Sequence, residues 1–304
     1  MVDIEKYKEA LELKKLGYSA KIIADKLKVN ICTINNWNIS RGNIKYEKII
    51  KGDYNRVKID ESTISPIEYL KTLSKLKDDK ELFKTYSYIF GLYLGDGCIS
   101  KLPRTKTLSI ALDIKYKNLN MDVINNFKLL FNDVKVIKRK GNCINVRYSN
   151  CNLGILFPQD SSGLKCDRKI NIEEWQSKIL DPIEFLRGLI MSDGSYYMRK
   201  SNKKFEYNFA NCSIDIINMV CKCLDILHIN YGLRYLLTKN KNYHNSYKIS
   251  IVAKESVDVL HYYIGDKENI VNRNNIENIG YYYEYDNVIS YRTMSHTKLS
   301  KNKI

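Results

Sequence analysis

The chain has 304 residues, which is enough for one to three domains with a sizeable buried core. Its 50 Lys and Arg exceed its 34 Asp and Glu, and the resulting net charge of +16, spread along the chain, favours a broad surface for a polyanion such as nucleic acid. Because the sequence lacks a signal-peptide core, an apolar run of membrane-spanning length and zinc-type Cys/His spacing, its eight cysteines are predicted to be reduced, small apolar fillers in a cytoplasmic protein.

Residues 1–40 are predicted to form a small all-helical unit. Ser19 and Asn30 are side chains of the kind that accept a hydrogen bond from the first turn of a helix, so helices are expected at residues 20–27 and 31–38. A first helix is expected to end at Gly17. Apolar side chains recur at helical spacing along the unit: Tyr7, Ala10, Leu11, Ile22, Ile23, Ala24, Val29, Ile34 and Trp37.

Four of these residues have the spacing of a helix-turn-helix: Ala24, Val29, Ile34 and Trp37. The series resembles the resolvase and sigma-factor kind, which usually has glycine at the left-handed turn position. Lys28 stands there in this chain, at a cost of about 1 kcal/mol. The resemblance implies that the third helix enters the DNA major groove, with three polar side chains as readers of bases or phosphates: Thr33, Asn35 and Asn36.

Residues 41–84 are predicted to be a lysine-rich linker that contains one docking helix. Pro66 stands where the first turn of a helix tolerates proline. Apolar residues follow it at helical spacing: Ile67, Leu70, Leu73 and Leu76.

Residues 85–180 are predicted to form a mixed unit with a helix at 119–131 and strands at 98–100, 108–115, 134–139 and 143–148. Apolar and polar residues alternate along 108–115, so one face should pack on the core and the other should be open. The open faces of these strands carry candidate contacts to DNA bases or phosphates: Lys115, Lys135, Arg139, Asn145 and Arg147.

Residues 181–280 are predicted to repeat this plan, and residues 281–304 form a Tyr- and Asn-rich tail to which the sequence assigns no role. Pro182 opens a helix. Strands are expected at 195–198, 205–211, 231–237 and 246–253, and helices at 214–227 and 254–264. Three basic residues of this unit are candidate DNA contacts: Arg199, Arg234 and Lys248.

A ten-residue motif occurs twice, at residues 88–97 and 185–194. Both copies are mostly apolar and end in Asp-Gly, which is typical of a core helix that stops at glycine. Small residues recur four positions apart in each copy, so they share one helix face and allow a partner backbone to come close. They are Gly91 and Gly95 in the first copy and Gly188 and Ser192 in the second.

Packing these two faces together would place Asp96 and Asp193 side by side. A carboxylate at a helix C-terminus costs about 0.3–1 kcal/mol, and two neighbouring carboxylates repel each other. Mg²⁺ removes both problems, because it binds one or two protein carboxylates together with phosphate oxygens. One copy alone would more often be an ordinary core helix, but the matched pair predicts a metal site at a pseudo-two-fold axis.

The motifs, at residues 89–97 and 186–194, resemble those of the LAGLIDADG homing endonuclease family. Four positions depart from the family pattern, although the last acid is kept in both copies: Phe90, Leu94, Arg187 and Met191. The resemblance implies an α+β monomer of tandem αββαββα repeats with saddle-shaped antiparallel sheets. It also implies double-strand cleavage of DNA at a long, pseudo-palindromic site.

The resemblance further implies Mg²⁺ (or Mn²⁺) as the cofactor and double-stranded DNA as the partner. The implied metal ligands are the carboxylates of Asp96 and Asp193 and the backbone carbonyls of Gly95 and Ser192. One catalytic lysine is implied in each half. The candidates by position are Lys165 (or Lys169) and Lys267.

Two other functions stay open. A LAGLIDADG-derived transcription regulator would join this fold to a helix-turn-helix without cutting, but the two retained acids argue against a pure binder. An intron maturase would bind RNA with the same fold. A self-splicing intein is not expected, because the sequence has neither a terminal nucleophile nor a C-terminal His-Asn.

Overall fold

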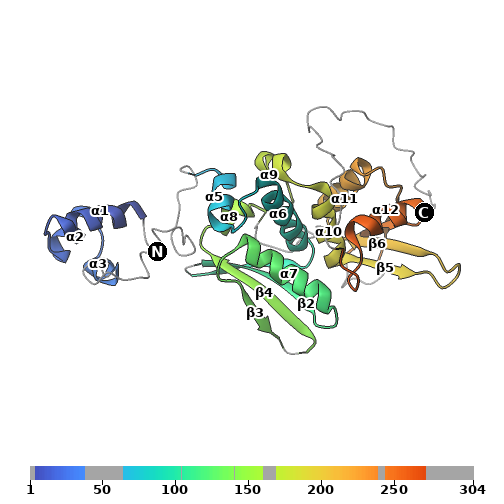
Figure 1. The fold of residues 1–304 in the computed structure, drawn as a ribbon, viewed down its shortest axis with the longest axis horizontal. Helices are drawn as coiled ribbons and strands as arrows, with labels where there is room; N and C mark the ends of the chain where they lie inside the picture. Colours follow the sequence, from blue (N-terminus) through green and yellow to red (C-terminus); the bar gives the residue numbers. More distant parts are fainter. Residues whose placement is uncertain are drawn as a thin grey trace.

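The computed structural model describes residues 4–37, 64–103, 105–139, 141–159, 169–238 and 244–271. Its elements form an N-terminal group of three helices followed by two α+β repeats, which confirms the predicted fold class (Figure 1). None of the helices in these ranges combines the length and the hydropathy that crossing a membrane requires.

The N-terminal helices have a small core of their own. They are α1 (Ile4–Lys15), α2 (Ala20–Leu27) and α3 (Ile31–Trp37). The Ser19 hydroxyl accepts from the backbone of α2, and Asn30 Oδ1 accepts from Cys32 N at 2.8 Å, as expected of caps. Lys28 adopts the left-handed conformation, with φ 51° and ψ 48°. The buried residues are Tyr7, Ala10, Ile23, Ala24, Leu27, Ile34 and Trp37.

The prediction that Ile22 faces the core of this unit is wrong. Ile22 is 45% exposed, whereas its neighbour Ile23 is fully buried. Adjacent residues on an α-helix point about 100° apart, so a narrow helix face buries one of them and not both.

Two four-stranded antiparallel sheets have the same strand order, β1-β2-β4-β3 and β5-β6-β8-β7. The first contains β1 (Gly97–Leu102), β2 (Thr105–Asp113), β3 (Lys135–Lys138) and β4 (Cys143–Asn150). The second contains β5 (Gly194–Met198), β6 (Phe205–Asn211), β7 (Gly232–Leu236) and β8 (Ser246–Ile251). This common order confirms the tandem repeat.

Helices cover one face of each sheet and leave the other face to polar side chains. The first repeat uses α7 (Lys117–Leu130) and α8 (Leu153–Leu156), and the second uses α11 (Ile214–Ile226) and α12 (Lys254–Ile264). Along β2 the predicted apolar face is buried at Leu108, Ile110 and Leu112. The alternation of the sequence therefore sets which sheet face meets the core.

Two helices differ from the sequence expectation. Helix α5 (Pro66–Leu73) has the predicted proline start, with a Ser65–Glu68 capping box, but it ends before Leu76. Helix α9 (Glu174–Ile179) was not predicted. Its Trp175 lies 5.7 Å from the ring of Tyr86, so the segment between the repeats is packed against the first motif helix.

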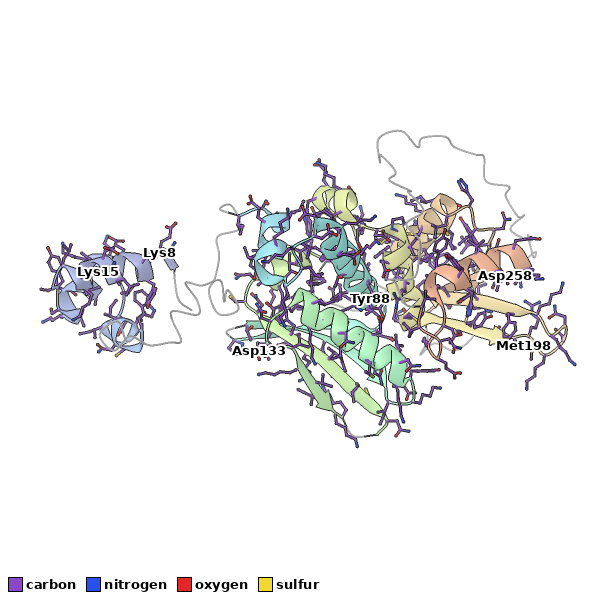
Figure 2. The ribbon with its side chains drawn as sticks, viewed as in Figure 1. Lys8, Lys15, Tyr88, Asp133, Met198 and Asp258 are labelled. Carbon is purple, nitrogen blue, oxygen red and sulfur yellow. The ribbon has the colours of Figure 1, made fainter. Side chains whose placement is uncertain are left out.

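The two motif helices, α6 (Asp79–Leu94) and α10 (Pro182–Asp193), cross at their small residues. A methyl group built on Gly91 would overlap the carbonyl oxygen of Phe185 and lie 3.0 Å from Gly188 Cα. One built on Gly188 would overlap the carbonyl oxygen of Tyr88. The backbones therefore touch, as the four-residue spacing predicts. Tyr88 marks this junction between the repeats in Figure 2.

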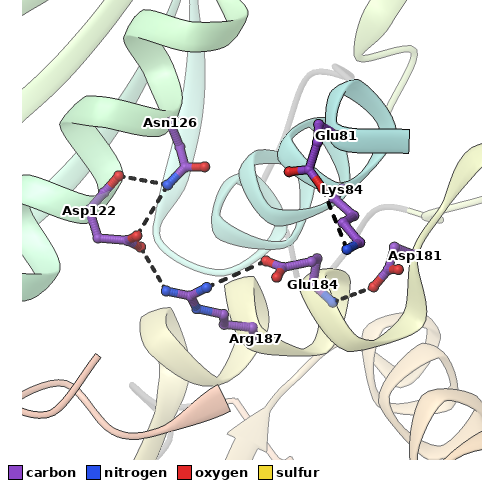
Figure 3. Close-up of polar contacts among 7 residues, drawn as sticks. All are labelled: Glu81, Lys84, Asp122, Asn126, Asp181, Glu184 and Arg187. Carbon is purple, nitrogen blue, oxygen red and sulfur yellow. Dashed lines mark hydrogen bonds and ion pairs between the residues drawn. The ribbon is translucent and has the colours of Figure 1, made fainter. Parts of the chain in front are cut away.

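A charged cluster crosses the same junction (Figure 3). Arg187 of α10 is fully buried and lies 3.2 Å from Asp122 Oδ2 on α7 and 3.7 Å from Glu184 Oε2. Its guanidinium also lies 4.9 Å from the centre of the Tyr88 ring. Since a buried charge is tolerated only when it is paired, Arg187 ties the second motif helix to the first repeat in one arrangement.

The cysteines differ in burial, and Cys143, Cys151 and Cys212 are half-buried. All those in the described ranges are free thiols, and Cys221 and Cys223 are buried as predicted, with burial raising the pKa of Cys223 to about 12. Cys32 and Cys98 are exposed, so the prediction that all eight cysteines are small apolar fillers is wrong for these two. Cys166 lies outside the described residues.

Gly91→Ala should destabilise the protein, because the added methyl group meets backbone of the partner helix, which cannot move aside as a side chain can. We expect a loss of about 1–3 kcal/mol, even though alanine favours a helix by up to about 1 kcal/mol. Gly232→Ala is the control, since its nearest atom would be Ser250 O at 3.9 Å. Urea unfolding would measure both, and equal stabilities would contradict the close crossing.

Candidate functional site

The two motif acids lie where the paired helices end. Asp193 is the last residue of α10, and Asp96 is exposed between the Gly95 cap of α6 and strand β1. A methyl group built on Gly95 would overlap the Ser192 hydroxyl and lie 3.7 Å from Asp193 Cγ. The Asp193 carboxylate of the second repeat therefore lies next to the end of α6, where Asp96 of the first repeat follows.

Asn211 at the end of β6 fixes the Asp193 carboxylate. Asn211 Nδ2 donates to Asp193 Oδ2 at 2.8 Å, and Asn211 Oδ1 accepts from Ser213 N at 2.9 Å. Because the oxygen of the amide is held by a backbone N–H group, the nitrogen is the atom that points at the acid. Asn211 was not predictable from the sequence, since a single Asn at a strand end carries no spacing signal that links it to Asp193.

Of the predicted catalytic lysines, Lys267 reaches the site. Its Nζ donates to the backbone carbonyl of Ser192 at 2.7 Å, at the negative end of the α10 dipole. This hydrogen bond occupies the carbonyl that the resemblance gave to a metal ion. Lys165 lies outside the described residues, and Lys169 is exposed beside Ile170, whose N–H donates to Asp215.

The side chains present fit a cation that takes its remaining ligands from water and substrate. No group of three or more His, Cys, Asp or Glu side chains with metal-binding geometry occurs in the described part of the chain. The donor set is therefore two carboxylates, Asp96 and Asp193, with the backbone carbonyl of Gly95 at the end of α6. Proteins commonly hold Mg²⁺ through one or two carboxylates in this way, and water and substrate phosphates supply the other ligands.

The polar face of the first sheet carries three of the predicted basic residues. Lys135 and Arg147 are opposite each other on β3 and β4, so their side chains share a face. Arg139 follows β3 and its N–H donates to Cys143 O at 2.9 Å, which continues the alternation of Lys135. Asn145 is buried on this same face, beside Ser109.

The placement of Lys115 on a strand is wrong. Strand β2 ends at Asp113, whose carboxylate accepts from Lys115 N at 3.0 Å and so turns the chain toward α7. The Lys115 ammonium lies 4.4 Å from the centre of the Tyr116 ring. It is exposed, but in a turn and not on the polar face of the sheet.

The polar face of the second sheet carries the other three basic residues. Arg234 and Lys248 are directly opposite on β7 and β8. Arg199 follows β5 and forms an ion pair with Glu206, a buried residue of β6 that was not among the candidates predicted from the sequence. Burial favours the neutral acid, but hydrogen bonds from Tyr197, Asn208 and Arg199 outweigh it and lower the pKa of Glu206.

The candidate DNA readers of the N-terminal unit lie on α3. Thr33 is half-buried and Asn35 is exposed. The side chain of Asn36 lies outside the described residues.

Comparison with known proteins finds a family model that matches the second repeat. The family model of the LAGLIDADG-like domain matches residues 181–265. The homing endonuclease I-DmoI in complex with DNA and Ca is similar in structure, with 16% identity, a TM-score of 0.41 and alignment over 63% of this chain and 95% of that chain. The N-terminal LAGLIDADG domain of DUF199/WhiA gives 19% identity, a TM-score of 0.40, and 65% and 85% coverage. No curated protein sequence matches the chain.

Glu206→Gln should remove a pH-dependent part of the stability. Because the folded-state pKa of Glu206 lies below its ordinary value of 4.5, the ionised form stabilises the fold above that value, and the contribution is lost as pH falls through the folded-state pKa. In urea unfolding, the stability difference between wild type and variant should be constant near neutral pH and shrink in acid. A difference that is the same at every pH would contradict the prediction.

Arg199→Gln is the matched partner for this test. If Arg199 and Glu206 act as a pair, the double variant should lose less stability than the sum of the two single variants.

Proposed function

We propose that this chain, which contains a LAGLIDADG-like domain at residues 181–265, is a site-specific DNA endonuclease that breaks both strands with the help of divalent cations. The observation that carries the proposal is the convergence of Asp96 and Asp193 at the ends of two helices in backbone contact. A stable fold gains nothing from two acids at that place, because each faces a helix dipole and the other acid. A binding site for cations and phosphate explains both.

The substrate that fits is double-stranded DNA. The chain has a net charge of +16, and basic residues lie on the polar faces of both sheets: Lys135, Arg139, Arg147, Arg199, Arg234 and Lys248. Antiparallel strands fit a major groove, where phosphate contacts give affinity and base contacts give specificity. Two repeats with one strand order and different side chains suit a long site whose halves are related but not identical.

Four side chains at the ends of the motif helices have proposed roles in cleavage. Asp96 and Asp193 would hold Mg²⁺ or Mn²⁺, and Asn211 orients the second acid. A divalent cation bound there supplies the positive charge that hydrolysis of a phosphodiester needs at the scissile phosphate. Lys267 adds a fixed positive charge beside Asp193, and Lys165, or Lys169, is our candidate for the same role in the first half.

The remaining parts of the chain are assigned by position. Residues 1–40 would form a helix-turn-helix that binds DNA through Thr33, Asn35 and Asn36, and residues 41–84 would join it to the nuclease. Residues 85–180 and 181–280 would each contact one half-site. Because both acids come from one chain, we propose that the protein acts as a monomer.

Asp96→Asn and Asp193→Asn should each abolish double-strand cleavage, because a neutral amide is a poor ligand for a hard divalent cation. The assay is cleavage of a randomised duplex library in Mg²⁺, followed by sequencing of the ends. Binding in Ca²⁺ should persist, since the basic surfaces are unchanged. Asp258→Asn, which removes an exposed acid on α12, is the control and should cut normally.

The proposal fails if the wild-type protein binds DNA sequences selectively without any metal-dependent cutting. That result would favour a DNA-binding regulator. Selective binding of RNA in place of duplex DNA would favour the maturase function.

Lys267→Met should slow cleavage by roughly 10²–10³-fold while the Kd for DNA changes by only a few-fold, because a positive charge fixed at the reacting phosphate acts mainly on the transition state. The matched control is Lys254→Met, which removes an exposed lysine at the start of α12. Single-turnover rates with saturating protein measure the effect. Unchanged rates would leave Lys267 as a helix cap and nothing more.

A further inference from the structure

The second sheet has a polar network on the face away from its helices. We call it the Glu206 network, and it consists of Tyr197, Arg199, Glu206, Asn208 and Ser250. Tyr197 is opposite Glu206 in the β5–β6 register, and Asn208 is opposite Ser250 in the β6–β8 register. Because side chains alternate along strands, these residues share one face with each other. The network therefore lies on the surface proposed above to meet DNA.

Glu206 is the centre of this network. It is only 4% exposed, although it is on the polar face. Asn208 Nδ2 donates to Glu206 Oε1 at 3.0 Å, and Ser250 Oγ donates to Asn208 Oδ1 at 2.7 Å. The other oxygen, Oε2, accepts from Arg199 Nη2. The carboxylate is thus held from both sides before any partner arrives.

The Glu206 network orders the side chain of Arg199. Its side chain is 45% exposed, so it remains open to a partner while Nη2 is held by Glu206. Its backbone is fixed as well, because Arg199 N donates to Lys204 O at 2.8 Å and Lys203 N donates to Arg199 O at 2.9 Å. A long side chain that is already ordered loses less conformational entropy when it binds.

The first sheet has no counterpart of this network at the corresponding strand positions. Counting from the glycine that starts each motif strand, the pair Tyr197 and Glu206 corresponds to Ser100 and Thr107. Thr107 shares a hydrogen bond of 2.9 Å with Ser149, between two neutral hydroxyl groups. The fixed Arg–carboxylate pair is therefore a property of the second repeat and not of the duplicated fold.

A phosphate contact does not account for this arrangement. An arginine that binds phosphate is helped by free positive charge, but the Glu206 carboxylate offsets the charge of Arg199 and repels a phosphate. Recognition of a base edge has the opposite requirements. It needs donors in a fixed plane, which a guanidinium supplies to the O6 and N7 acceptors of guanine.

We propose that Arg199 reads a guanine in the half-site that the second repeat contacts, and that Glu206 is the positioning residue that fixes the guanidinium for this contact. The inference rests on the proposed binding of duplex DNA, but not on cleavage. It assigns specificity to one position of the site and to one base.

The test is selection of binding sites from a randomised duplex library with the full chain in Ca²⁺. Wild-type protein should select guanine at one position of one half-site. Arg199→Ala should lose that preference, by roughly 5- to 150-fold in the ratio of Kd values for adenine and guanine, and keep the preferences elsewhere. Lys200→Gln removes a neighbouring exposed charge and should weaken all sequences alike.

Two further measurements separate positioning from simple stability. Replacing that guanine with 7-deazaguanine removes the N7 acceptor, so it should weaken wild-type binding several-fold and leave Arg199→Ala unchanged. Glu206→Gln should reduce the guanine preference while keeping most of the affinity for DNA. Arg199→Lys tests the base contact itself, because an ammonium cannot make the planar two-donor contact. If Glu206→Gln does not fold, Asn208→Ala tests the positioning role, because it removes the hydrogen bond to Glu206 Oε1 and leaves Arg199 in place.

The outcomes are distinguishable. Uniform loss of affinity across all sequences in Arg199→Ala would make Arg199 a phosphate contact and overturn the inference. An unchanged guanine preference in Glu206→Gln would overturn the positioning role. If the wild-type protein selects no duplex sequence at all, the proposed function fails first.

Discussion

The contact between the backbones of α6 and α10 is the constraint on which the rest of the structure depends. Gly91 and Gly188 allow it because a side chain at either position would occupy the space of the partner helix. Once the two helices cross there, each of them fixes the first strand of its own sheet, β1 or β5, which starts within three residues of the helix end. The two sheets, and the two acids at the helix ends, are then placed by a single crossing.

The same crossing brings together charged groups that need partners. The helix ends bring Asp96 and Asp193 to one place, and Asn211 and Lys267 supply a hydrogen bond and a positive charge beside the second acid. Earlier in α10, Arg187 is buried where the aligned position of the first motif is an aromatic residue, Phe90. Removing one partner of such a buried pair typically costs about 3–5 kcal/mol, so this cluster favours one arrangement of the repeats.

Sequence patterns predicted what depends on spacing along the chain. The motif repeat predicted the helix crossing, and alternation predicted the buried face of β2. Contacts between distant residues were not predictable in this way. Asn211 meets Asp193 because strands β5 and β6 pair in one register, and Glu206 is buried because its neighbours on two strands cover it. Lys115 was misplaced because Asp113 ends the strand through a side-chain hydrogen bond that alternation does not reveal.

The two repeats share strand order but not surface chemistry, and this difference has a physical origin. The helix-facing sides must pack, so both sheets keep apolar residues there, such as Ile110 in the first and Phe209 in the second. The opposite faces carry no such requirement, and they differ: the first sheet has a Thr–Ser pair where the second has a buried carboxylate with an ordered arginine. A single chain with one frame can in this way present two unequal surfaces, which a symmetric homodimer cannot do.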